Sequence, residues 1–286
     1  MIRNIAVIGI SVLAALALLV LLVLFWQGKR KPDTSGQYVA LGSSFAAGLG
    51  LGAREPGSPF VCMRSTNGYP HQLARLTGLS LVDMSCSGST TEHILKGGQV
   101  FLGPQIDAVG ADTRLVTITS GGNDVGYIGD LTLASGGAGA LGKLLLSEPK
   151  PVAERNFGLV TENMIKIVQA VRARAPKAVI ALVSYPNLLP ENASCKELGF
   201  DAAVADRGRQ VAARLHEATK LAAEQSGAIF VDMAGASAGH DICSAAPWVN
   251  GAAPGSGAPF HPNQAGAEAT AQTVHKAVAE LLQTAQ

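Results

Sequence analysis

The sequence has few charged residues, 15% of its 286 positions, and few aromatic residues, at 5%. The charges nearly balance, with 22 basic and 21 acidic side chains, whereas a nucleic-acid-binding domain needs a clustered basic face. No nucleic-acid partner is therefore expected. Glycine and proline, at 33 and 14, are too scattered for a low-complexity chain, and no internal repeat is present. The composition instead fits one well-buried domain of about 250 residues.

The N-terminus carries one long apolar run, Ile5–Trp26, without a charged residue. As a helix it would extend about 33 Å, enough for a bilayer core of about 30 Å. A cleaved signal peptide has a shorter apolar stretch and a small-x-small cleavage site, which is missing here. We therefore expect a transmembrane helix that acts as an uncleaved signal anchor, with residues 1–36 as anchor and tether and residues 37–286 as the domain.

Cysteine is also rare. The four cysteines form no C-x-x-C pair and no Cys/His cluster with zinc spacing; they are Cys62, Cys86, Cys195 and Cys243. An even number behind an export-like segment fits two disulfides in an oxidising compartment. The basic run Lys29–Lys31 would favour a cytoplasmic body under the positive-inside rule. We give the disulfide argument more weight than the charge argument and expect a membrane-anchored, extracytoplasmic domain.

The histidines other than His261 stand alone, without acidic or cysteine partners at metal-ligand spacing. They are His71, His93, His216, His240 and His275. No metal and no organic cofactor is expected.

From Tyr38 onward, apolar β-rich runs alternate with helical patterns. Strands are predicted over 38–41, 79–84, 114–119, 178–183 and 228–231, and helices over 70–76, 155–173, 201–225 and 262–282. This alternation predicts an α/β fold of three layers, α/β/α, with a parallel sheet covered on both faces. Ligands bind at the carboxyl ends of the strands in such sheets.

Polar segments follow three of these strands, and a fourth precedes the last helix. They are Gly42-Ser43-Ser44, Ser87-Gly88-Ser89, Gly121-Gly122-Asn123-Asp124 and Phe260-His261-Pro262. All four could meet at one edge of the sheet. Together they supply the hydroxyl, the imidazole and the hydrogen-bond donors that acyl transfer needs.

In this order the four segments resemble the four blocks of the SGNH (GDSL-like) hydrolases, over Tyr38 to Leu282. The resemblance implies a flavodoxin-like five-stranded sheet and a serine ester hydrolase that works through a covalent acyl-enzyme. It implies Ser44 as nucleophile and His261 as base. The oxyanion hole would consist of the N–H groups of Ser44 and Gly88 and the side chain of Asn123.

The same resemblance, to actinobacterial secreted esterases in particular, implies the disulfides Cys62–Cys86 and Cys195–Cys243. Two positions depart from the family pattern. Ser43 replaces the aspartate that precedes the nucleophile, which makes Ser43 a rival nucleophile. Ala258 replaces the aspartate three positions before the histidine. A backbone carbonyl of Ala258 or a neighbour is then expected to accept from the His261 ring, in preference to Asp241.

A competing motif, Gly235–Gly239, fits the G-x-S-x-G nucleophile elbow of α/β-hydrolases. That motif requires a helix directly after the serine, and the residues that follow here are a poor helix start. We therefore disfavour it.

The substrate is less constrained. The leucine-rich insertion Gly126–Pro151 could line an acyl pocket, which favours lipid or acyl esters at the cell envelope. It contains Leu131, Leu133, Leu141, Leu144, Leu145 and Leu146. A polysaccharide O-acetyl esterase is the alternative, disfavoured because sugar sites usually offer stacking aromatics. An inactive envelope binding module, with Ala258 as the mark of a decayed triad, is the alternative of another class.

Overall fold

Five parallel strands form one sheet in the order β2-β1-β3-β4-β5. The computed structural model describes residues 2–137, 149–191 and 195–284, with the backbone alone described for residues 2–13. The strands are β1 (Tyr38–Gly42), β2 (Leu81–Asp83), β3 (Leu115–Thr119), β4 (Val179–Val183) and β5 (Ile229–Val231). This is the flavodoxin-like strand order, and it confirms the parallel five-stranded sheet expected from the sequence.

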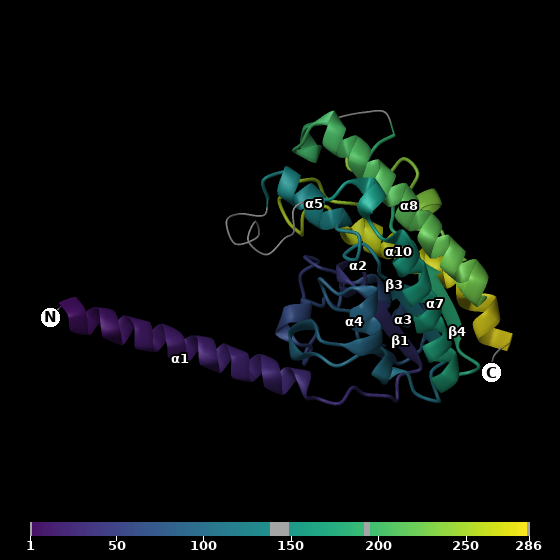
Figure 1. Ribbon diagram of the computed structural model, residues 1–286. Coiled ribbons are helices and arrows are strands. Elements are labelled where there is room, and N and C mark those ends of the chain that lie inside the picture. Colours follow the sequence, from purple (N-terminus) through teal and green to yellow (C-terminus); the bar gives the residue numbers. More distant parts are fainter. Residues whose placement is uncertain (1, 138–148, 192–194, 285–286) are drawn as a thin grey trace.

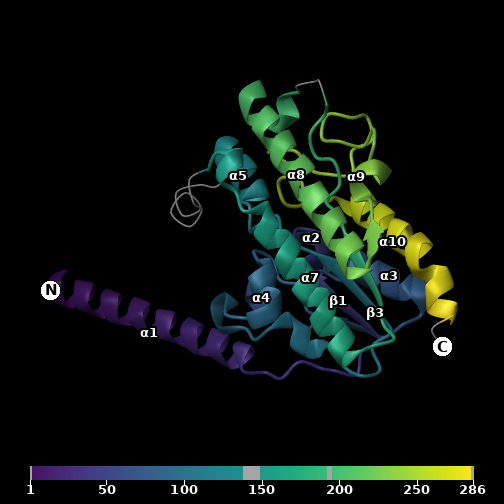
Figure 2. The same ribbon diagram turned by 45° about the vertical axis from the view of Figure 1, so that its right-hand side comes forward.

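Helices cover both faces of the sheet and complete the three layers (Figures 1 and 2). One face carries α4 (Thr91–Lys96), α7 (Phe157–Arg174) and α8 (Ala202–Ser226), and the other carries α3 (Tyr69–Thr77) and α10 (Gln264–Thr284). The side chains of Asn156 and Asp201 cap the first turns of α7 and α8. Such caps satisfy N–H groups that have no partner within the helix.

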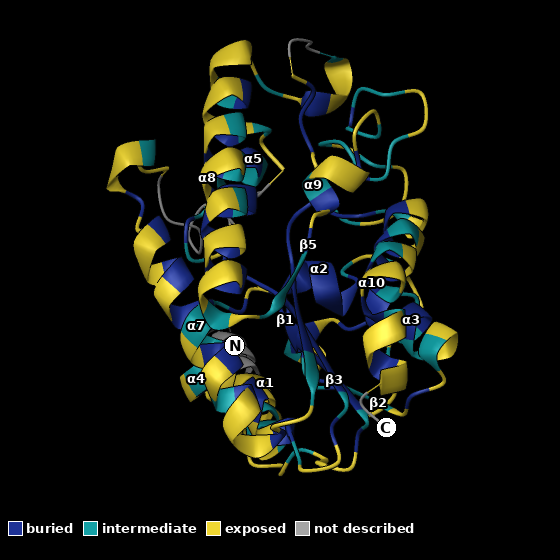
Figure 3. Ribbon diagram, turned by 90° about the vertical axis from the view of Figure 1, so that its right-hand side faces the viewer, coloured by how far each residue is buried: buried dark blue, intermediate teal, exposed yellow. Residues whose placement is uncertain are grey.

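Successive side chains along each strand point to opposite faces of the sheet and so pack into two separate hydrophobic cores. Val39, Leu41 and Val116 pack on the α7/α8 side, whereas Tyr38 and Ala40 pack on the α3/α10 side. All five are fully buried, as expected for strands covered on both faces. Figure 3 shows the same layering, with dark blue central strands and partly buried, teal edge strands between helices whose outer faces are exposed.

The sequence patterns do not predict the shorter helices, because each has too few residues for a clear periodicity. They are α2 (Ser44–Ala47), α5 (Tyr127–Ala134) and α9 (Met233–Ala236), together with the 3-10 turns η1 (Phe60–Cys62), η2 (Gln99–Phe101), η3 (Gln105–Ala108), η4 (Val152–Glu154) and η5 (Lys196–Leu198). The most important of them is α2, which begins directly after β1.

The expected transmembrane helix requires correction. The apolar run forms α1 (Ile2–Gly28). In the described part of the chain, however, no helix is both long enough and apolar enough to cross a bilayer.

Candidate active site

A strand, a sharp turn and a short helix place Ser44 at the carboxyl edge of the sheet. The φ angle of Gly42 is 144°, and a Cβ there would lie 2.3 Å from the Thr119 carbonyl oxygen, so only glycine fits. The next residue, Ser43, donates its N–H to that same carbonyl at 2.9 Å. Ser44 is then the first residue of α2. Its N–H has no intrahelical partner, as at any helix start.

The Ser44 hydroxyl lies against the ring of His261, although 217 positions separate the two residues. Ser44 Oγ is 2.8 Å from His261 Nε2, and each residue is 7% exposed. The Phe45 ring packs beside the imidazole, with ring centroids 5.1 Å apart. The structure therefore joins the two residues expected to act as nucleophile and base.

The other ring nitrogen fixes the tautomer of His261. Nδ1 lies 2.7 Å from the carbonyl oxygen of Pro259, which can only accept a hydrogen bond. The ring proton must therefore sit on Nδ1, and Nε2 is free to accept the hydroxyl proton of Ser44. The family's missing aspartate is replaced by a backbone carbonyl next to Ala258, as the sequence predicted.

Burial lowers the pKa of His261 to about 4, and the hydrogen bond with Pro259 only partly opposes this shift. Desolvation disfavours the charged imidazolium. The ring is therefore neutral at pH 7 and able to take up a proton.

The expected oxyanion donors follow the carboxyl ends of three neighbouring strands, β1, β2 and β3. Among the described residues, neither Ser44 N–H nor Gly88 N–H donates to another protein group. The Asn123 amide donates one N–H to the Ser89 carbonyl at 2.8 Å. Its second N–H stays free, and Asn123 is exposed. Three polar N–H groups from three loops are thus available for an anion.

Residues 40–269 match the GDSL-like Lipase/Acylhydrolase family. The chain belongs to this family. It is 36% identical over 244 residues to Lipase 2 of Streptomyces coelicolor, a match that covers 80% of this chain and 81% of the relative.

Two solved structures are similar to this GDSL-like hydrolase. The extracellular lipase from Streptomyces rimosus is 28% identical, with a TM-score of 0.69 over 84% of this chain and 98% of that one. Phospholipase A1 from Streptomyces albidoflavus is 25% identical, with a TM-score of 0.70 over 85% and 99%. The chain is thus a serine-type carboxylic ester hydrolase, as expected from its motifs.

In this GDSL-like hydrolase Ser43 belongs to a buried network on the far side of the turn. Ser43 is fully buried, and its Oγ lies 3.1 Å from the Tyr185 hydroxyl. Gly122 N–H donates to the same hydroxyl at 3.2 Å, so Tyr185 links the nucleophile turn to the segment that carries Asn123. Tyr185 follows β4 at the carboxyl edge, and this position was the only signal in the sequence that could have identified it.

Gln105, in η3, is a second residue that the sequence did not single out. Its side chain accepts from Gly42 N–H at 2.8 Å and donates to the Gly42 carbonyl at 3.0 Å. It also donates to Ser89 Oγ at 2.9 Å. One amide therefore connects the nucleophile turn to the segment that carries Gly88. No motif marks it, because a glutamine in a loop has no characteristic spacing.

Two disulfides brace the loops, in the pairs expected from the sequence: Cys62–Cys86 and Cys195–Cys243. The first joins the loop after Ser44 to the segment before Gly88. Ser87 N–H also donates to the Cys62 carbonyl, at 3.1 Å, so this contact has both covalent and polar parts.

The serine of the competing G-x-S-x-G motif, Ser237, does not contact the His261 ring. Ser237 is fully buried, and its hydroxyl accepts from Asn187 N–H and donates to the Ala234 carbonyl. Asp241 accepts from Cys243 N–H instead of reaching the His261 ring.

Proposed function

We propose that the enzyme hydrolyses lipid or acyl esters, with Ser44 as nucleophile and His261 as general base. The 2.8 Å contact between Ser44 Oγ and His261 Nε2 carries this proposal, because a serine hydroxyl needs a neighbouring base to attack a carbonyl. The N–H groups of Ser44 and Gly88 and the free Asn123 N–H form the proposed oxyanion hole.

In the first half-reaction Ser44 Oγ attacks the ester carbonyl carbon while its proton passes to His261 Nε2. The carbonyl oxygen becomes an oxyanion that the three N–H donors stabilise. The ester C–O bond then breaks, and the alcohol leaves with the proton held on Nε2. Ser44 now carries the acyl group.

In the second half-reaction water takes the place of the alcohol. His261 Nε2 removes a proton from water, the hydroxide attacks the acyl carbon, and the proton returns to Ser44 Oγ as the carboxylic acid leaves. Throughout, the Pro259 carbonyl keeps Nδ1 protonated and holds the ring in one orientation. It also stabilises the imidazolium that forms transiently.

The substrate class rests on the relatives, which are named as lipases and as a phospholipase A1. The leucine-rich insertion contributes little to the proposal: Leu131 is buried in the core, and residues 138–148 lie outside the described residues. We place the catalytic domain in residues 37–286 and locate it outside the cytoplasm. The two disulfides fit such an oxidising location, and the Streptomyces rimosus relative is an extracellular lipase.

Hydrolysis of p-nitrophenyl acetate and p-nitrophenyl octanoate by the full chain tests the function. We expect turnover of both esters, with the higher kcat/KM for octanoate. Ser44→Ala should lose on the order of 10⁶-fold in kcat, as a serine hydrolase without its nucleophile does. Turnover of acetate alone would favour a polysaccharide O-acetyl esterase instead.

The neighbouring serine provides a matched control. Ser43→Ala removes a hydroxyl one position away but leaves the contact between Ser44 and His261 in place. It should retain most of the activity. Inactivation by Ser43→Ala together with an active Ser44→Ala would refute the assigned nucleophile.

A further inference from the structure

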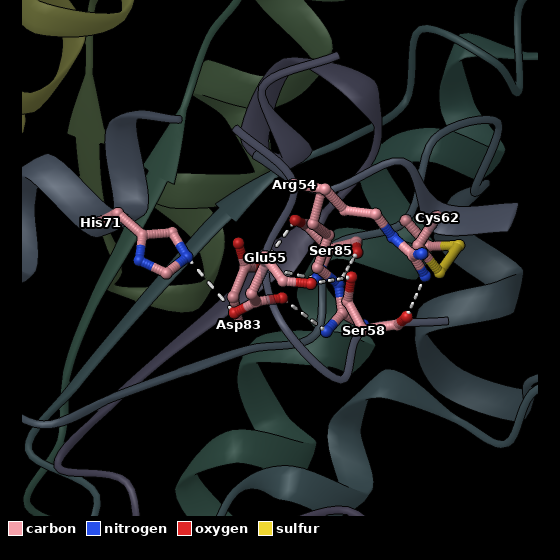
Figure 4. A network of polar contacts seen from close by, with 9 residues as sticks. Arg54, Glu55, Ser58, Cys62, His71, Asp83 and Ser85 are labelled. Carbon is pink, nitrogen blue, oxygen red and sulfur yellow. Dashed lines mark hydrogen bonds and ion pairs between the residues drawn. A yellow bond between two sulfur atoms is a disulfide. The ribbon is translucent and has the colours of Figure 1, made fainter. Parts of the chain in front are cut away.

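A second cluster of reactive side chains lies beneath the loop that follows the nucleophile helix. Glu55 belongs to this loop (residues 48–68), His71 lies in α3, and Asp83 is the last residue of β2. Figure 4 shows these side chains pointing toward one another. One ligand atom from each lies within 4.8 Å of the other two.

Two of the three ligand atoms have no hydrogen-bond partner within the described structure. They are Asp83 Oδ2 and His71 Nε2. Asp83 is only 4% exposed, and its other oxygen, Oδ1, accepts both the N–H and the hydroxyl of Ser85, at 2.9 and 2.6 Å. His71 Nε2 faces Glu55 Oε1 at 3.2 Å, in an ion pair. Buried polar atoms are nearly always paired, so the buried Asp83 Oδ2, which has neither a hydrogen bond nor an ion pair among the described residues, indicates a ligand.

The charges of the cluster favour a cation. Arg64 Nη1 lies 3.3 Å from Glu55 Oε2, and Arg64 Nε donates to the Ser85 carbonyl at 2.6 Å. The guanidinium therefore holds one oxygen of Glu55 and leaves Oε1 for another partner. Two carboxyl groups therefore share one guanidinium. A divalent cation would add positive charge to the cluster and give Asp83 Oδ2 the partner that it lacks.

We propose that Glu55 Oε1, His71 Nε2 and Asp83 Oδ2 bind a zinc ion, with water as the fourth ligand. One imidazole and two carboxylates suit zinc, whereas calcium takes six to eight oxygen ligands. Ligand atoms of a tetrahedral zinc lie about 3.3 Å apart. Glu55 Oε1 and His71 Nε2 are 3.2 Å apart, and Asp83 offers a ligand atom within 4.8 Å of the other two residues' ligand atoms. A cavity of about 420 Å³, lined in part by Glu55 and Asp83, gives the ion an entry path.

Most structural zinc ions have four protein ligands, but an ion held by three would still connect separate segments of the chain beside the active site. It would connect the loop of residues 48–68 to α3 and to the edge strand β2. The same loop contains Cys62, and its Ser65 N–H donates to the Ala47 carbonyl at 2.8 Å, at the end of the nucleophile helix. The spacing rules applied to the sequence missed this group because its three members lie on three separate elements.

Zinc binding to the untagged full-length protein tests the proposal without reference to hydrolysis. After EDTA treatment and dialysis, zinc is titrated by calorimetry, and the melting temperature is measured with and without zinc. We expect one ion per chain and a higher melting temperature, because a ligand that binds only the folded state stabilises it. His71→Gln and Asp83→Asn should each weaken binding by more than about 100-fold, since changes in the outer shell alone cost about 10–100-fold.

His275→Gln is the matched control. It makes the same substitution at another half-buried histidine, on α10, and it should leave zinc binding unchanged. His71 is not deeply buried, so His71→Gln decides the question even if Asp83→Asn fails to fold. Equal zinc affinity in wild type and His71→Gln would overturn the proposal. So would the absence of binding to wild type, which would leave the cluster as an ion-pair network.

Discussion

Burial of His261 predicts that ester hydrolysis persists at unusually acidic pH. The pKa of the ring is lowered to about 4, from an ordinary value of about 6.5. Only the neutral ring can accept the Ser44 proton, so kcat/KM should stay level below neutrality and fall only as the pH falls through about 4. At about pH 5, about 90% of rings with a pKa of 4 are neutral, against about 3% at an ordinary pKa. At about pH 5, kcat/KM should therefore be about 30-fold higher than it would be with a histidine of ordinary pKa.

The same shift makes the free energy of unfolding depend on pH. Between about pH 6.5 and pH 4 the unfolded chain binds a proton at this ring and the folded chain does not. The contribution of His261 to stability is therefore fully present above about pH 6.5 and is lost as the pH falls towards 4. The total loss is about 3 kcal/mol, at 1.36 kcal/mol per pKa unit.

Two assays check this reasoning. The first is the pH profile of kcat/KM for a soluble p-nitrophenyl ester. The second is denaturant unfolding of wild type and His261→Gln over the same pH range, where the difference between the two curves isolates this one group. An inflection of kcat/KM near pH 6.5, or parallel stability curves for the two proteins, would refute the account of a desolvated imidazole.

Four further predictions concern side chains around the site. Asn123→Ala should lower kcat by about 10²–10³-fold with little change in KM, the usual loss for one oxyanion donor; an unchanged kcat would remove Asn123 from the site. Tyr185→Phe should lower the free energy of unfolding by about 1–3 kcal/mol, because Gly122 N–H and Ser43 lose their partner. Tyr127→Phe, whose buried hydroxyl has no partner among the described residues, should be neutral or stabilising in the same denaturant assay. Replacing Cys62 and Cys86 together with serine should cost about 2–4 kcal/mol, measured by thermal unfolding, and equal melting temperatures would show that the pair is dispensable.

The architecture was predictable because the apolar strand runs and the helical periodicity both indicate an α/β fold. The buried runs at Tyr38–Leu41 and Arg114–Thr119 are apolar throughout, as parallel strands require, and the long helices between them have clear periodicity. The carboxyl-edge rule indicated that the segments with Ser44 and His261 could meet at one edge of the sheet, and the family resemblance implied the roles of the two residues.

The features of the active site that the sequence could not predict depend on backbone groups or on contacts between residues far apart in the chain. Any residue has a carbonyl, so nothing marked Pro259 as the acceptor for the His261 ring. Gln105 and Tyr185 act through contacts between loops that no local pattern records. The apolar run at Ile5–Trp26 was read as a transmembrane helix from its length and composition, and the structure does not support that interpretation.

Covalent labelling distinguishes Ser44 from the other candidate nucleophiles. The full-length enzyme is treated with a fluorophosphonate, digested, and mapped by mass spectrometry, with His261→Ala treated in parallel. We expect one adduct, on Ser44, and little or none in His261→Ala because the hydroxyl is no longer activated. An adduct on Ser43 or Ser237, or equal labelling of Ser44 without the imidazole, would contradict it.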